Sequence, residues 1–257
     1  MSSPRISIVT VVFNRAATVG EALRSVQAQS YENVEHVVVD GASDDGTLEV
    51  VEAHRIPSMR VLSEPDEGIY DALNKGMALA EGDVIGVMHS DDSYADTDVL
   101  SEVAACFRDE AVDAVYGDLE YVAADDPGRV VRYWSAGDYS LQRLRRGWMP
   151  PHPTLFVRRS VVERLGGYDT SFRIAADYDA ILRWFGRGGL RAAYLPRVLV
   201  RMRLGGESNA SLRALLRKSS EDYRALRRNE VGGALALLLK NASKLPQFLD
   251  RRGMPRS

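Results

Sequence analysis

Two adjacent aspartates, Asp91 and Asp92, have the type and position that most directly suggest chemistry. They follow Ser90, directly after the apolar run 84–88, which is too short for a helix and has the length of a buried parallel strand. In open parallel sheets, ligands bind beyond the carboxyl ends of the strands. One such carboxylate can hold Mg²⁺ or Mn²⁺ together with substrate phosphates, and the other can accept hydrogen bonds from a sugar hydroxyl. The alternative is a loop that caps the next helix, since Asp is common at N-caps and turns.

The segments before these aspartates predict the elements that position them. Apolar residues spaced as on one face of a helix predict a helix over 69–80, which ends before Gly82. Strands are expected at 6–13, 34–39 and 60–63, with helices after the first two. Thr18 and Glu21 have the spacing of a capping box at the start of the first helix. This alternation of strand and helix predicts a mostly parallel α/β sheet with right-handed crossovers.

The alternation weakens after Asp92. A helix is expected at 99–107, and strands at 112–122 and 129–134 are joined by a hairpin-type turn. A strand at 154–157, short helices near 161–165 and from Asp177, and a strand at 194–202 broken near Pro196 complete this part. The segment 211–250 then reads as two helices.

Three of the expected strands end in polar loops, namely Asn14-Arg15, 40–47 and 90–92. Together these loops would line one rim of the sheet with acceptors and backbone amides. No G-x-G-x-x-G follows the first strand, and no Walker motif is present. Such a rim suits a nucleotide whose diphosphate is carried by a metal ion rather than by a glycine-rich loop.

Composition sets broad limits on the function. The chain has 257 residues, 45% of them hydrophobic and 27% charged, which is ordinary for a globular protein of one large or two small domains. A net charge of −3 argues against a nucleic-acid binder. The single cysteine, Cys106, rules out an internal disulfide and fits a reducing compartment. Neither a signal-peptide pattern nor a spanning apolar run is visible, so a cytoplasmic location is expected.

Four segments together resemble the family 2 glycosyltransferases, in particular members of bacterial polysaccharide and cell-envelope biosynthesis. The segments are Thr10–Arg15, Val38–Thr47, Asp66–Asp92 and Ala176–Arg183. The resemblance covers about four-fifths of the chain, and the order and spacing of the segments carry it. It implies a single GT-A domain over 1–208, with a nucleotide-binding half (1–92) and an acceptor-side half (93–208). A basic helical extension over 209–257 would follow.

The resemblance also implies roles for individual residues. Asp91 would touch the ribose or donor sugar, and Asp92 would bind Mn²⁺ or Mg²⁺. The donor would be a nucleotide-diphosphate sugar, with UDP preferred over GDP or dTDP. The remaining residues expected at the nucleotide sugar are Thr10, Val11, Phe13, Asn14, Asp40, Ser43, Asp66, Gly68, Asn74, Lys75 and Ser90. Many family members have an Asp-Asp pair where this chain has Asp40-Gly41.

The catalytic base implied by the resemblance is Asp177. The family has Glu-Asp where this chain has Ala176-Asp177, and a second acid at Asp179 is the alternative base. Asp177 could instead act as the N-cap of its helix, a role compatible with catalysis. His152, between two prolines, is a further candidate beside the diphosphate or the acceptor. The loop 205–208 resembles one that closes over the donor in a bacterial branch of the family, against the alternative of an ordinary turn.

The implied reaction is an inverting transfer to a hydroxyl of a glycan or lipid-linked acceptor. It needs one carboxylate within hydrogen-bond reach of the attacking hydroxyl and a cation to stabilise the leaving diphosphate. A sugar-phosphate nucleotidyltransferase would need a glycine-rich, basic loop after the first strand, where this chain has Asn14–Ala17. A non-catalytic module that keeps the nucleotide-sugar pocket is the other alternative.

The C-terminal segment has a basic excess, with eleven Lys or Arg against four Asp or Glu between Arg213 and Arg256. A basic, partly amphipathic end can lie on an anionic membrane, which predicts peripheral contact with the inner face of the cell membrane. The alternative is that its leucines, together with Tyr223 and Leu226, pack on the domain and leave the charges in solvent.

Overall fold

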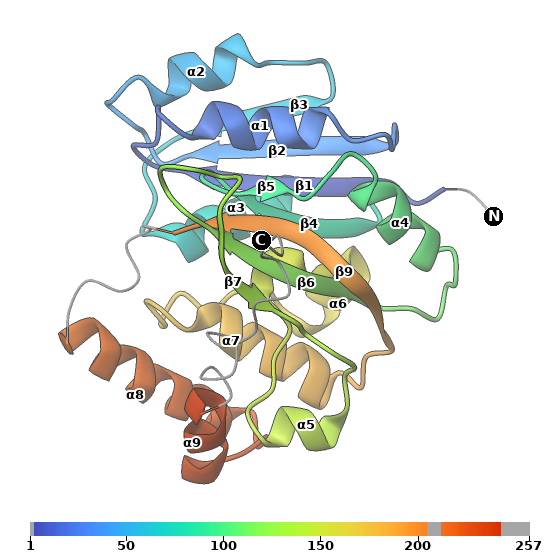
Figure 1. Ribbon diagram of the computed structural model, residues 1–257, viewed down its shortest axis with the longest axis vertical. Helices are drawn as coiled ribbons and strands as arrows, with labels where there is room; N and C mark the ends of the chain where they lie inside the picture. The colour runs from blue at the N-terminus through green and yellow to red at the C-terminus, as the bar shows by residue number, and fades with distance from the viewer. Residues whose placement is uncertain (1–2, 205–211, 243–257) are drawn as a thin grey trace, which may run out of the picture.

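The computed structural model describes residues 3–204 and 212–242 (Figure 1). One sheet runs through the molecule in the order β3-β2-β1-β4-β8-β6-β9-β5, and β7 pairs with β6. Helices lie on both of its faces. The last two helices, α8 and α9, lie at the end of the molecule farthest from α2 (Figure 1).

The first half of the sheet is parallel throughout. Its strands are β1 (Ile6–Val12), β2 (Val34–Asp40), β3 (Met59–Ser63) and β4 (Val84–His89). β1 lies in the centre, between β2 and β4. All of its residues are buried, because β-branched side chains can pack on both faces of a parallel sheet that helices cover.

Alternate residues of β1 face different helices. Val9 and Val11 pack in the same cluster as α3 (Ile69–Leu79), whereas Val12 packs with α1 (Val19–Gln27) and α2 (Thr47–Ala53). α3 approaches β1 closely at Gly76, where a Cβ atom would lie 2.3 Å from Val9 Cγ1. The close approach fixes the position of α3, whose first turn faces the rim of the sheet.

The second half of the sheet is mixed. Its strands are β5 (Ser93–Tyr94), β6 (Ala114–Val122), β7 (Val130–Trp134), β8 (Phe156–Arg158) and β9 (Ala192–Arg203). β8 pairs antiparallel with both β4 and β6, while β9 pairs parallel with β6 and antiparallel with β5. The mostly parallel sheet that the sequence predicts is therefore present: the long strands β6 and β9 are parallel to each other, and the short strands β5, β7 and β8 are the antiparallel ones.

The helices of the second half surround these strands. They are α4 (Val99–Cys106), α5 (Leu141–Arg145), the 3₁₀ turn η1 (His152–Thr154), α6 (Arg159–Leu165) and α7 (Ala176–Ile181), which continues into the π-helical segment η2 (Leu182–Arg187). α4 packs on the same face of the sheet as part of α1, and α7 packs on the face that carries α3.

The chain ends in the two helices that the sequence predicts, α8 (Leu212–Arg228) and α9 (Ala234–Ala242). Ala225, Leu226, Val231 and Ala236 belong to the same core cluster as α3 and α7. Leu226 is therefore buried as one alternative proposed, whereas Tyr223 is exposed. No helix within residues 3–204 and 212–242 is long and apolar enough to cross a bilayer.

Two local predictions differ from the structure. Thr18 is the N-cap of α1, but its side chain makes no capping hydrogen bond, and Glu21 pairs with Arg203 instead. β9 continues through Pro196, where the register with β6 shifts, so the predicted break is a bulge inside one strand. The Glu21–Arg203 ion pair ties α1 to the end of β9.

Candidate functional site

The loop after β2 is held in place by the buried carboxylate of Asp40. This carboxylate accepts hydrogen bonds from the Ser43 hydroxyl and, at 2.6 Å, from the Ser63 hydroxyl. Ser43 in turn accepts from the backbone N–H of Asn14, which has a left-handed backbone (φ 51°) at the end of β1. The Asn14 side chain accepts from the amide of Asp44. The expected rim residues of β1 and β2 therefore form one preorganised turn.

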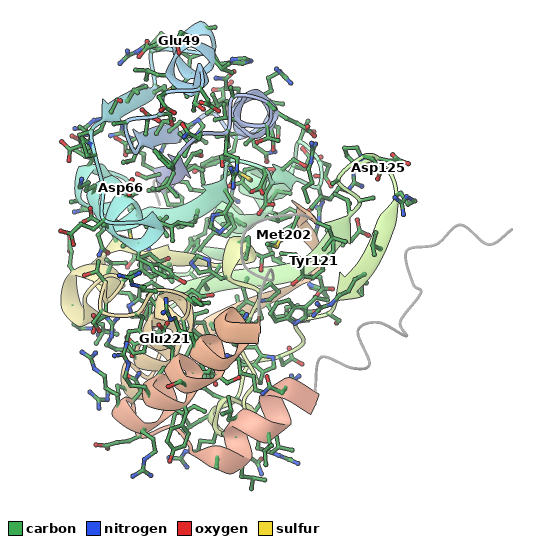
Figure 2. All side chains as sticks on the ribbon, turned by 90° about the vertical axis from the view of Figure 1, so that its left-hand side faces the viewer. Glu49, Asp66, Tyr121, Asp125, Met202 and Glu221 are labelled. Atoms are coloured by element: carbon green, nitrogen blue, oxygen red, sulfur yellow. The ribbon has the colours of Figure 1, made fainter. Side chains whose placement is uncertain are left out.

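Phe13, Gly41 and Asp66 meet at this rim. The Phe13 ring is 57% exposed, so an aromatic face is open to solvent at the end of β1. A Cβ atom on Gly41 would lie 2.5 Å from Asp66 Oδ2 and 3.3 Å from Phe13 Cδ2. Asp66, visible at the edge of the upper half in Figure 2, thus fills the space that an aspartate at position 41 would need. A side chain at position 41 would therefore require the Asp66 carboxylate to move.

Asp92 lies at the junction of the two halves and is 2% exposed. Its Oδ1 accepts from the backbone N–H of Arg203 at 3.3 Å, while its Oδ2 is buried without a hydrogen-bond partner. Burial, and then the charge of Asp91, raise the pKa of Asp92 well above its usual value. A buried carboxylate oxygen without a partner is costly for the protein unless a cation or donor completes it.

Asp177 is in the first turn of α7, and its charge acts on the same histidine, His89, as that of Asp91. Its Oδ1 accepts from the Tyr178 amide at 2.7 Å and lies 3.3 Å from the Tyr70 hydroxyl, which donates to the Ile174 carbonyl at 2.7 Å. The residue at the N-cap is Ala175, so the capping role considered for Asp177 is wrong. Asp177 is partly exposed and keeps a carboxylate oxygen that can face the site.

Two histidines, His89 at the end of β4 and His152 in η1, lie near Asp177. The rings of His89 and His152 are 5.8 Å apart, and His152 Nε2 is 2.7 Å from the Tyr168 hydroxyl. Burial lowers the pKa of His89, and the charges of Asp91 and Asp177 both oppose this shift. Burial also lowers the pKa of His152 to about 4, against the charge of Asp177. Asp91 and Asp177, 86 positions apart in the sequence, therefore act on the same histidine.

Several expected site residues have other partners in the structure. The Asp179 carboxylate is buried and accepts from Asn229 at 2.8 Å and Arg183 at 3.4 Å. The Asn74 amide donates to the Tyr168 carbonyl and accepts from the Tyr168 N–H. These two side chains hold helices and loops together.

The other expected residues divide between rim and interior. Thr10 is completely buried and lies 2.9 Å from His36 Nε2, and Val11 belongs to the core. Lys75 pairs with Glu64 at 2.8 Å. Gly68, with φ 120°, lets the chain turn into α3, and Ser90 is buried beside Asp91. The loop 205–208 lies outside the described residues.

The sequence did not single out Tyr70, His89 or Arg203 as site residues, although His89 stands directly at the end of β4. The second half also contains the aromatic residues Tyr133, Trp134, Trp148 and Tyr168, a residue type that can stack on sugar rings. In the structure Tyr168 supports His152, and Trp148 packs among Tyr139 and Phe185. Whether one of these aromatic residues supports another side chain or packs in the core depends on contacts between segments that are far apart in the sequence.

A divalent cation would find few protein ligands here. No group of three or more His, Cys, Asp or Glu side chains within the described part of the chain could hold a metal ion. The open Oδ2 of Asp92 and the neighbouring Asp91 nevertheless fit an ion that takes its other ligands from substrate phosphates, as Mg²⁺ and Mn²⁺ commonly do.

The sequence model of glycosyl transferase family 2 matches residues 7–166, more than half of the chain. The chain belongs to glycosyltransferase family 2. An uncharacterized glycosyltransferase of Mycobacterium tuberculosis is 33% identical over 198 residues, which cover 71% of this chain and 69% of the relative. A PGL/p-HBAD biosynthesis glycosyltransferase of Mycobacterium bovis is 32% identical over 214 residues, which cover 81% of each chain.

Solved structures confirm the GT-A fold of this glycosyltransferase. The mannosyltransferase PcManGT of Pyrobaculum calidifontis, in complex with GDP-Man and Mn²⁺, has a TM-score of 0.67 at 21% identity, and covers 96% of this chain and 74% of its own. S. aureus TarS 1-349, in complex with UDP-GlcNAc, has a TM-score of 0.66 at 20% identity, and the match covers 88% of this chain and 66% of that one. At these identities the structural similarity shows a shared fold and no more than that.

The buried pair of Thr10 and His36 in this glycosyltransferase predicts a pH dependence of stability. Burial lowers the pKa of His36 to about 4, against 6.5 for a free histidine. The unfolded chain then binds a proton at higher pH than the folded one, so the free energy of unfolding should fall as pH drops from about 6.5 to about 4. Urea unfolding of His36→Gln should show a shallower fall than wild type over this range. An unchanged slope would show that His36 is not the group responsible.

Proposed function

We propose that this glycosyltransferase moves a sugar from a nucleotide-diphosphate sugar to a hydroxyl of a glycan or lipid-linked acceptor, with inversion at the anomeric carbon. The observation that supports the proposal is that Asp91 and Asp177, far apart in the sequence, both come near the ring of His89, while Asp92 keeps a buried carboxylate oxygen without a hydrogen-bond partner. A direct displacement needs one base on the acceptor side and a charge-stabilised leaving group on the other side. In this proposal Asp177 supplies the base, and Asp91 and Asp92 hold the cation that stabilises the leaving group.

The donor would lie along the rim formed by the ends of β1, β2 and β4. Phe13 offers an exposed ring to the base, and the Asn14–Ser43–Asp40 network fixes the loop beside it. Asp66 and Asp91 offer carboxylates to sugar hydroxyls. We place UDP ahead of GDP and dTDP as the nucleotide, and because related folds carry UDP-GlcNAc or GDP-Man, both are probes for the experiments below.

Asp92 would hold Mn²⁺ or Mg²⁺ through its Oδ2, the buried oxygen that has no hydrogen-bond partner, and Asp91 would assist. The bound ion would stabilise the negative charge of the leaving diphosphate. Arg203 fixes the other oxygen of Asp92 through its backbone N–H, and its own side chain is held by Glu21. The carboxylate is therefore oriented before any ligand binds.

Asp177 would accept the proton of the attacking hydroxyl. The Tyr70 hydroxyl and the Tyr178 amide orient its Oδ1, which leaves Oδ2 for the acceptor. His152, with its lowered pKa, is neutral at physiological pH and would shape the acceptor side without adding charge. Asp179 does not compete for the role because Asn229 and Arg183 occupy its carboxylate.

Peripheral membrane contact is proposed for the exposed side of α9. Leu235 and Leu238 are 70% and 67% exposed and stand one helical turn apart. The helix before it, α8, exposes Arg224, Arg227 and Arg228. Exposed apolar side chains in a basic helical extension suit the interface of an anionic bilayer, the inner face of the cell membrane in this proposal.

The metal assignment predicts the behaviour of Asp92→Asn. The substitution keeps the shape and the contact with Arg203 but removes the charge, so Mn²⁺-dependent binding of UDP or GDP should weaken at least tenfold or disappear. Isothermal calorimetry with and without Mn²⁺ measures this directly. Glu64→Gln, on the exposed loop after β3, is the control and should bind as wild type. Unchanged Mn²⁺-dependent affinity in Asp92→Asn would contradict the assignment.

The base assignment predicts that Asp177→Asn lowers turnover by roughly 10²–10⁴-fold, the usual scale for loss of a general base. Nucleotide affinity should remain, because Asn keeps the size of the side chain and the proposal gives Asp177 no contact with the nucleobase or the diphosphate. Release of nucleotide from UDP-GlcNAc or GDP-Man by transfer to water serves as the assay.

Asp179→Asn is the matched control. Its turnover, normalised to the concentration of folded protein, should stay within about threefold of wild type. A rate for Asp177→Asn near wild type would transfer the role to another group. A wild-type protein that binds the donor but turns over neither donor would favour the non-catalytic module.

The membrane proposal predicts that the protein sediments with vesicles containing anionic phosphatidylglycerol and less with neutral phosphatidylcholine. Binding should weaken as salt rises, since exposed charges are screened. The double variant Leu235→Ser/Leu238→Ser should release the protein, whereas Val131→Ser, an exposed apolar residue on β7, should not. Equal recovery in the supernatant with both lipids at low salt would refute the proposal.

A further inference from the structure

The helix that carries Asp177 begins without a cap of its own. Ala175 is the N-cap of α7, and an alanine side chain cannot accept a hydrogen bond. The first amides of a helix lack intrahelical partners and need an acceptor from elsewhere. The Glu221 carboxylate on α8, on the side of α8 that faces α7 (Figure 2), binds the amides of the segment that leads into α7, the last of them being that of the N-cap residue Ala175.

Glu221 binds three consecutive amides ahead of Asp177. Its Oε1 accepts from Arg173 at 3.2 Å, and its Oε2 accepts from Ile174 at 2.8 Å and from Ala175 at 3.1 Å. Hydrogen bonds to an ionised acceptor are stronger than neutral ones and restrict geometry more tightly. The backbone that enters the catalytic turn is therefore fixed from the C-terminal part of the chain.

Tyr70 on α3 holds the same segment from the other side. Its hydroxyl donates to the Ile174 carbonyl at 2.7 Å and lies 3.3 Å from Asp177 Oδ1. The Ile174 residue thus has its N–H bound by Glu221 and its C=O bound by Tyr70. The tyrosine that orients the Asp177 carboxylate depends for its position on the peptide that Glu221 holds.

The C-terminal helices also contact the residues that follow Asp177. Lys240 on α9 pairs with Asp222 on α8 at 2.8 Å, and both side chains are almost completely buried. The Lys240 ammonium lies 3.2 Å from the centre of the Tyr178 ring. Asn229 donates to the Asp179 carboxylate at 2.8 Å. Contacts from α8 and α9 therefore reach residues on both sides of Asp177.

We infer that Glu221 is a positioning residue for Asp177: it fixes the entry to α7 so that the Asp177 carboxylate meets the acceptor hydroxyl. The inference rests on the proposed role of Asp177 as base. Displacing a catalytic group by about 1 Å can cost on the order of 10²-fold in rate even when the change is made at a distance. Glu221 does not touch the rim where the nucleotide would bind, so its loss should act on turnover and not on nucleotide affinity.

The test compares Glu221→Ala, Glu221→Gln and Asp177→Asn in the full chain, with Arg227→Ala on the exposed side of the same helix as the matched control. Turnover of UDP-GlcNAc or GDP-Man with Mn²⁺ and calorimetric affinity for UDP or GDP are measured for each. Glu221→Ala should lose roughly 10- to 10²-fold in kcat, with nucleotide Kd within about twofold of wild type. Glu221→Gln should recover part of the rate, because its amide oxygen still accepts. Arg227→Ala should match wild type.

Amide hydrogen exchange separates positioning from general loss of structure. In Glu221→Ala the amides of 173–175 should exchange faster, while those of β1 and β4 keep their protection. If kcat and nucleotide affinity fell together, or if the β1 and β4 amides also lost protection, Glu221 would be a stabilising residue only and the inference would be wrong.

Failure of the inference can be told apart from failure of the proposed function. An inactive Asp177→Asn beside a Glu221→Ala with wild-type kcat would overturn the positioning role alone. A fully active Asp177→Asn would overturn the base assignment itself, and with it the role of Glu221.

Discussion

Two hydrogen bonds between the Asn74 side chain and the backbone of Tyr168 join the halves of this molecule. The Asn74 amide donates to the Tyr168 carbonyl at 2.8 Å and accepts from its N–H at 2.9 Å. Gly167 makes this contact sterically feasible, because a Cβ atom there would lie 2.5 Å from Asn74 Oδ1. Both backbone groups of Tyr168 are thereby satisfied from α3, which lies in the first half of the chain.

The geometry of the site depends on these two hydrogen bonds. The Tyr168 hydroxyl meets His152, and its ring lies 5.7 Å from the ring of Tyr70, whose own hydroxyl meets Asp177. His152 and Asp177 are thus held relative to α3, and α3 is fixed against β1 through the close contact at Gly76. Packing in the core therefore positions both side chains relative to the central strand.

The electrostatics of the site are set mainly by burial. Asp92 keeps one carboxylate oxygen without a partner in a buried position, which raises its pKa and makes the free protein pay a desolvation cost. The same low-dielectric surroundings strengthen the attraction of this carboxylate for a cation. Burial keeps His152 neutral as well, so this ring adds no positive charge beside Asp177.

The sequence by itself determined the helices and strands of the first half and the location of the two aspartates that follow β4. β1, β2, β4 and α3 lie within a residue or two of their predicted limits, because the apolar periodicity of a strand or helix is local information. The tertiary structure alone decided which polar residues face the site. Thr10 bonds to His36 inside the sheet, Asn74 clamps a residue 94 positions away, and Asp179 is held by Asn229, 50 positions further along. The direction of a side chain on a helix or strand depends on such distant contacts, which spacing along the chain does not encode.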